Sequence, residues 1–213
     1  MKRLTVVAWT CGIGLAFVGG ALAGTAPGKA EHQQMSARPF KPLPAGAEGR
    51  IFLNTAQMAE ARSAGTVARP VRSLLAITAP MAFGDYVWNE KGVAPGSTWI
   101  RVDLRSQIIS VFRGSDEIGT AVIVYGGDNK KTPSGALHIL AKARNHRSSL
   151  YDASMPYTLR LTGDGVSIHG SSVRWGAATH GCIGVPLPFA ERLFAAVRIG
   201  DEVDITPPTR TGA

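Results

Sequence analysis

Apolar and polar residues begin to alternate near residue 98, and the alternation predicts a series of short β-strands. Ile100, Val102 and Leu104 are separated by charged residues, which is the period-2 pattern of a half-buried strand. Residues 105–107 predict a turn, and residues 108–112 predict the partner strand of a hairpin. Residues 118–125 are mostly β-branched and apolar, which predicts a buried strand.

The strand pattern continues through most of the C-terminal half. Residues 132–135 (Thr-Pro-Ser-Gly) predict a tight turn into a strand over 136–141. Residues 157–162 alternate again, and Gly-Asp-Gly at 163–165 predicts a hairpin turn into a strand over 166–169. Many short strands at this spacing are typical of an antiparallel-rich sandwich or barrel, so the predicted fold is mostly β.

A single helix stands out near residues 188–199. Pro188 suits its first turn, and Gly200 is placed to cap its end. One face of this helix is apolar, being formed by Phe189, Leu193, Phe194 and Val197. Residues 203–205 then predict a last strand, and residues 207–213 predict a polar tail.

The first 23 residues have the layout of a secretory signal peptide. Two basic residues precede an apolar run over 4–18, and small residues at 19–23 supply a cleavage site of the Ala-x-Ala type. The alternative is an uncleaved membrane anchor, but the run is short for a span and no charged stop follows it. We therefore expect no stable membrane span after cleavage, and a location in the periplasm or cell wall.

Two further segments precede the strand-rich region. Residues 24–50 are rich in Pro, Gly and Ala without hydrophobic periodicity, which predicts a flexible linker. Residues 51–97 form an N-terminal extension that we expect to pack on or near the domain, with a short helix that begins at a Thr55 N-cap. The catalytic domain is then expected over residues 98–206.

The charge of the chain suits anionic partners. Lys and Arg outnumber Asp and Glu by 23 to 15, giving +8, and removal of residues 1–23 takes away two basic residues and leaves 21 − 15 = +6. A basic surface favours polyanions. In an exported protein these are envelope polymers and lipid head groups, so no nucleic-acid partner is expected.

The candidate chemistry centres on one thiol. Of the two cysteines, Cys11 lies in the predicted signal peptide, which leaves Cys182 without a disulfide partner. His180 lies two residues before it and His169 thirteen residues before it, and either can act as the base that a thiol nucleophile needs. The loop lies close before the predicted helix, whose N-terminus would favour a thiolate, and the turn at Gly181 can present amides to an oxyanion.

Metal binding is the rival chemistry. His169, His180 and Cys182 can in principle bind zinc, but the sequence lacks the paired ligand spacing that structural zinc sites use, so no metal is expected. The other histidines, His32, His138 and His146, are interpreted as surface or core residues.

The same residues carry a family resemblance. His169-Gly170 followed by Thr179-His180-Gly181-Cys182 resembles the signature of L,D-transpeptidase catalytic domains. Further segments agree: residues 100–104 with Gln107 look like the family's opening hairpin, residues 132–135 like its Thr-Pro-x-Gly turn, and residues 155–161 like its approach to the site. The resemblance covers residues 98–206.

The resemblance implies a β-sandwich of mixed sheets and a set of roles. Cys182 is implied as the nucleophile and His169 as its base, oriented by the Gly170 carbonyl. The amides of Gly181 and Cys182 are implied as the oxyanion site. The implied pocket residues are Thr179, His180 and Tyr157. No cofactor is implied.

The implied substrate is the peptidoglycan stem peptide. The thiolate attacks the carbonyl of its third residue, releases the terminal D-alanine and forms a thioester, which an amine of a second stem converts into a 3→3 cross-link. Two alternatives stay open: a carboxypeptidase that uses water as acceptor, and a wall-binding module with a drifted catalytic loop. Family members commonly carry Arg or Asn two residues after the cysteine, where this chain has Gly184, and Arg174 is a candidate to supply the missing charge.

Overall fold

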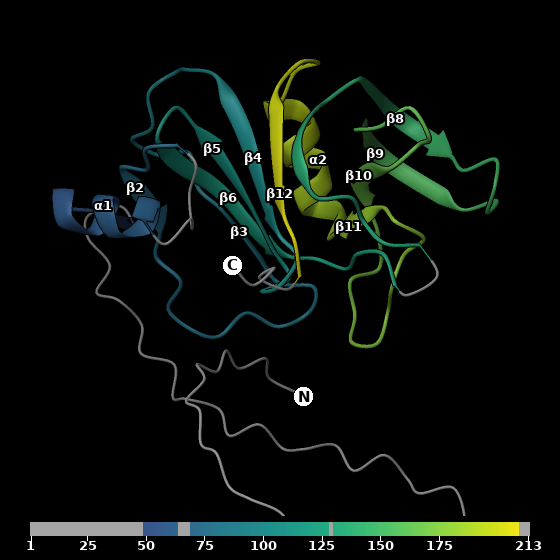
Figure 1. Cartoon of the computed structure of the whole chain (residues 1–213), viewed down its shortest axis with the longest axis horizontal. Helices are drawn as coiled ribbons and strands as arrows, with labels where there is room; N and C mark the ends of the chain where they lie inside the picture. Colours follow the sequence, from purple (N-terminus) through teal and green to yellow (C-terminus); the bar gives the residue numbers. More distant parts are fainter. Residues whose placement is uncertain (1–48, 64–68, 128–129, 209–213) are drawn as a thin grey trace, which may run out of the picture.

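The computed structural model describes residues 49–63, 69–127 and 130–208 (Figure 1). The predicted signal peptide, nearly all of the predicted linker and the last five residues of the tail lie outside the described residues. The described part is built from two β-sheets and two helices, which confirms the predicted mostly β fold with mixed sheets.

The larger sheet has eight strands. Its order is β1-β2-β6-β5-β4-β12-β7, and β3 pairs with β6 outside this path. The predicted hairpin forms its centre, because β4 and β5 pair along their full length through the turn that contains Gln107. The strands are β1 (Arg50–Phe52), β2 (Ser73–Leu75), β3 (Tyr86–Trp88), β4 (Thr98–Asp103), β5 (Ile108–Arg113), β6 (Asp116–Val122), β7 (Gly135–His138) and β12 (Glu202–Thr206).

The smaller sheet carries the residues of greatest chemical interest. Its order is β11-β10-β9-β8, with β10 and β11 parallel and the other pairs antiparallel. The strands are β8 (Ala141–Arg147), β9 (Ser154–Arg160), β10 (Ser167–Gly170) and β11 (Ile183–Val185). The sequence pattern predicted β9 and β10, but it gave no signal for β8, whose residues are mainly exposed and basic.

Helix α2 (Leu187–Ala196) packs between the two sheets (Figure 1). It packs on β9, β10 and β6, and Phe189 is fully buried against the rings of Tyr86 and Trp88. The core therefore combines apolar side chains from both sheets with one face of this helix. Burial of such side chains is the main stabilising contribution in a domain that contains no disulfide among its described residues.

The predicted ends of both helices need correction. Helix α2 ends at Ala196 with Val197 as its C-cap, so Gly200 lies in the following turn and does not cap it. Its last carbonyl groups accept hydrogen bonds from the Lys142 amine of β8. Helix α1 (Thr55–Ser63) is capped by Asn54 rather than Thr55, because the Asn54 side chain accepts a hydrogen bond from the Gln57 amide.

The segment before residue 97 contributes strands to the large sheet. β1 pairs with β2, and both β2 and β3 pair with β6. The Arg50 side chain, 2% exposed, anchors this edge by donating to the backbone carbonyls of Glu117 and Asn89. None of the helices in the described ranges is both long and apolar enough to span a membrane.

Candidate active site

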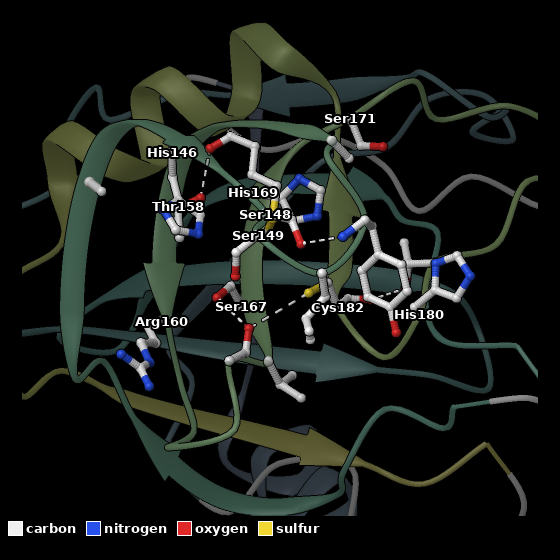
Figure 2. Close-up of a pocket in the computed structure, with 18 of the residues that line it drawn as sticks. His146, Ser148, Ser149, Thr158, Arg160, Ser167, His169, Ser171, His180 and Cys182 are labelled. Atoms are coloured by element: carbon white, nitrogen blue, oxygen red, sulfur yellow. Dashed lines mark hydrogen bonds between the residues drawn. The ribbon is translucent and has the colours of Figure 1, made fainter.

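One face of the smaller sheet forms the floor of a cavity of about 620 Å³. Its walls come from the loop between β8 and β9, the turn at 163–165 and the loop at 178–182. Figure 2 shows Ser167, His169 and Cys182 around this cavity, with Arg160 from β9 and His146 from β8. The structure thus brings together the cysteine and the histidine that the sequence singled out.

Strand register explains why these side chains meet. β10 and β11 pair with Ile168 opposite Ile183, so Cys182, one residue before β11, lies beside Ser167. Ser167 and His169 are two residues apart and therefore point to the same face of the sheet. Cys182 and His169 are consequently diagonal neighbours on adjacent strands.

Cys182 is a partly buried thiol without a disulfide partner. Its Sγ lies 3.9 Å from the Gly165 carbonyl oxygen. Burial raises the pKa of the thiol, and the nearby positive charge of Lys130 opposes this rise only in part. The neutral thiol form is therefore favoured.

The predicted role of a helix N-terminus at the thiol is wrong. The sequence places Cys182 close before α2, but strand β11 and Pro186 intervene, and α2 begins only at Leu187. The helix dipole acts mainly within the first turn, so it does not lower the pKa of this thiol.

His169 is held in one orientation at the end of β10. Its Nδ1 lies 3.0 Å from the Gly170 carbonyl oxygen, a contact in which Nδ1 carries the proton and leaves Nε2 as the basic nitrogen. Burial lowers the pKa of His169, the Gly170 contact raises it, and the charge of His146 lowers it further. The neutral imidazole is favoured, which is the form that accepts a proton.

The loop before Cys182 is fixed by backbone and side-chain contacts. Thr179 donates its hydroxyl to the Cys182 carbonyl at 2.5 Å, and its own amide donates to the Tyr125 carbonyl at 3.0 Å. Gly181 has φ +99°, a conformation that favours glycine. His180 stacks on Tyr151 of the β8–β9 loop with ring centroids 4.2 Å apart, so the two sides of the pocket touch there.

Two predicted site residues lie elsewhere. The expectation that Tyr157 forms a pocket wall is wrong, because its hydroxyl donates to Glu191 and its ring packs on Phe194, both on α2. Arg174 is exposed and is not among the residues that line the cavity.

Close packing by neighbouring side chains explains why residue 184 is a glycine. A Cβ at this position would lie 2.7 Å from a Val124 methyl group and 2.8 Å from the Ser171 Cβ. Both distances are too short, so the larger side chain common in the family does not fit here without rearrangement.

Sequence reasoning missed other residues that line the cavity. His146, interpreted as a surface or core histidine, lines it together with Arg160, Ser167 and Tyr151. His146, Arg160 and Ser167 reach the cavity through the register of the β8–β9–β10 sheet, which a single sequence does not display. Within the described ranges, no group of three or more His, Cys, Asp or Glu side chains is arranged to hold a metal ion.

A thiol beside an oriented, neutral histidine on one sheet face is a site suited to nucleophilic acyl transfer. The chain matches the YkuD family, described as the L,D-transpeptidase catalytic domain, over residues 97–205, about half of its length. It belongs to that family.

Several known proteins are similar to the chain. L,D-transpeptidase 1 of Mycobacterium tuberculosis is 25% identical over 133 residues, covering 54% of this chain and 53% of the relative. The chain thus spans about half the length of the curated relatives it matches. An L,D-transpeptidase structure from Mycobacterium smegmatis shares the fold, with a TM-score of 0.50 and 19% identity over 53% of this chain and 59% of that one. A crystal structure of an L,D-transpeptidase from Stackebrandtia nassauensis has a TM-score of 0.49 to this chain. It is 24% identical, over 56% of this chain and 60% of that one.

Proposed function

We propose that this protein is an exported cysteine transpeptidase that acts on peptidoglycan stem peptides. The observation that carries the proposal is the placement of Cys182 and His169 on one face of the smaller sheet, in a cavity large enough for a peptide. Membership of the L,D-transpeptidase family supplies the substrate class. The apolar run at the N-terminus supports export.

His169 activates the nucleophile in this mechanism. Its Nε2 accepts the Cys182 proton as the sulfur attacks the carbonyl carbon of the third stem residue, and the Gly170 carbonyl holds Nδ1–H in place. The imidazolium then gives this proton to the nitrogen of the terminal D-alanine as the C–N bond breaks. A thioester on Cys182 and free D-alanine are the products of this half-reaction.

In the second half-reaction Cys182 is the leaving group, and an amine is the nucleophile. The side-chain amine of a second stem attacks the thioester carbonyl, His169 takes its proton, and the proton returns to the sulfur as the C–S bond breaks. The product is a 3→3 cross-link. The amides of Gly181 and Cys182, in the turn where Gly181 has φ +99°, are the donors we assign to the tetrahedral oxyanion in both half-reactions.

Mass spectrometry tests the nucleophile directly. Incubation of the protein with a carbapenem is expected to add one covalent adduct to the wild type and none to Cys182→Ala. In the full-length chain, which keeps residues 1–23, Cys11→Ala is the matched control, because it removes the other cysteine and keeps Cys182. An adduct that persists in Cys182→Ala contradicts the assignment.

Product analysis separates the alternatives. With a tetrapeptide stem, the transpeptidase releases D-alanine and forms a cross-linked dimer, whereas a carboxypeptidase releases D-alanine without a dimer. A wall-binding module gives neither product and no adduct. We expect D-alanine and dimer in the wild type and loss of both in His169→Ala.

A further inference from the structure

The cationic residues of the active-site cavity are not equally available to a ligand. Lys130 lies 3.5 Å from Asp164, the acidic residue of the lining. The Lys142 amine donates to two carbonyl oxygens at the end of α2, at 2.5 and 2.6 Å. Arg160 makes no ion pair with any residue in the described part of the chain. Its guanidinium charge is therefore one that no carboxylate among the described residues neutralises.

Arg160 is nevertheless held in a defined orientation. Its Nε donates to the Thr162 carbonyl at 3.0 Å, and one of its terminal nitrogens donates to the Gly163 carbonyl at 2.5 Å. These oxygens fix the side chain without cancelling its charge. The other edge of the guanidinium group keeps donors for a ligand, since the group has five N–H donors in a planar fork that matches a carboxylate.

Strand register places Arg160 in line with the nucleophile. Ser167 on β10 pairs with Arg160 on β9, and Cys182 follows on the other side of Ser167. Figure 2 shows Arg160, Ser167 and Cys182 in this order across the cavity. Two strand spacings separate the Cα atoms of Arg160 and Cys182 by about 10 Å. An extended peptide advances about 3.5 Å per residue, so a substrate residue adjoining the scissile carbonyl lies between the two side chains.

We propose that Arg160 binds a carboxylate of the donor stem peptide and so selects donors with that carboxylate free. This inference rests on the proposed function and adds a binding residue to it. The carboxylate comes either from the C-terminal D-alanine or from a side chain of the inner stem residues. Both sources offer the same chemistry to a guanidinium group.

Binding to the full chain carrying Cys182→Ala tests the inference without turnover. Three ligands are compared by calorimetry: a tetrapeptide stem with all carboxylates free, the same peptide with an amidated C-terminus, and the same peptide with amidated side-chain carboxylates. We expect Arg160→Gln to raise the Kd of the free peptide about 10- to 100-fold, the range for a hydrogen bond to a charged group. Arg160→Lys is expected to recover part of this loss.

The amidated peptides identify the carboxylate. One of the two amidated peptides lacks the carboxylate that Arg160 binds. Its Kd for Cys182→Ala is expected to equal the Kd of the unmodified peptide for Cys182→Ala that also carries Arg160→Gln. For this amidated peptide, adding Arg160→Gln is expected to leave the Kd unchanged. Arg105→Gln is the matched control, because Arg105 is an exposed arginine in the β4–β5 turn, outside the cavity lining. It is expected to leave every Kd unchanged.

The outcomes for the inference and for the proposed function are separable. Three results overturn the inference. Arg160→Gln raises the Kd of all three peptides equally, it leaves the Kd of the unmodified peptide unchanged, or none of the peptides binds saturably. Release of D-alanine by the wild-type chain reports on the function alone. Binding that depends on Arg160 without release of D-alanine contradicts the function and leaves the inference standing.

Discussion

The buried carboxyl group of Glu117 makes the stability of this protein depend on pH. Glu117 lies on β6, is 5% exposed, and accepts a hydrogen bond from the Leu75 amide at 2.8 Å. Burial raises its pKa from 4.5 to about 7, and the charge of Arg50 offsets this rise only in part. Replacement by glutamine keeps an acceptor for the Leu75 amide and removes the titration.

The sign and size of the effect follow from linkage. The folded state holds the proton more tightly than the unfolded state, so this group stabilises the fold fully below pH 4.5 and loses that contribution as pH rises through about 7. The pKa difference corresponds to roughly 3 kcal/mol in total. Between pH 5 and pH 8, most of this contribution, roughly 2–3 kcal/mol of the free energy of unfolding, is lost.

Urea unfolding of the wild type and Glu117→Gln at pH 5, 6, 7 and 8 measures this term. The expected result is a wild-type free energy of unfolding that falls by roughly 2–3 kcal/mol more than that of the variant over this interval. Other titrating groups act on both proteins and cancel in the comparison. Glu60→Gln, on the exposed face of α1, is the matched control and should follow the wild type. Parallel curves for the wild type and Glu117→Gln would refute the reasoning.

Three further predictions concern the active site and its support. His146→Gln removes the charge that lowers the pKa of His169, so that pKa rises, and the acid limb of the kcat/KM pH profile moves to higher pH. Phe83→Ala removes an edge-to-face ring contact at 5.7 Å with Trp175, in the loop that leads to the nucleophile, so steady-state kinetics should show a lower kcat at similar KM. Gly184→Arg forces contacts at 2.7 and 2.8 Å, and calorimetry should show a Tm lower by about 5 °C.

The central strands and α2 could be predicted because their side-chain patterns report burial directly. Ile100 and Val102 alternate with polar residues on β4, and both are fully buried in the structure. Strand β8 gave no such signal, because most of its side chains are exposed and its order comes from pairing with β9. The predicted end of α2 was wrong for a similar reason. The group that binds the carbonyl oxygens at the end of this helix is the amine of Lys142, about 50 residues earlier in the chain, so the local sequence does not reveal it.

The site could be predicted in part. Cys182 and His169 stand in a recognisable motif, and the structure places His169 on β10 and Cys182 immediately before the neighbouring strand β11. Arg160 and His146 stand in no motif that the sequence analysis used, and they reach the cavity only through the register of three strands. Tyr157 shows the opposite error: it lies within the resembling segment, but its φ of +56° accompanies a side chain that packs on α2.

The pKa shifts of Cys182 and His169 bear on when the reactive thiolate forms. Burial raises the pKa of Cys182 and lowers that of His169, so both shifts oppose proton transfer from sulfur to imidazole. Under the proposed function, a donor peptide that places its carbonyl at the oxyanion amides offsets this cost, because the developing charge is stabilised there. A thiol kept neutral in this way resists oxidation, because the thiolate is the reactive species. If the protein is exported and acts as proposed, coupling of thiol activation to substrate binding protects the nucleophile between turnovers.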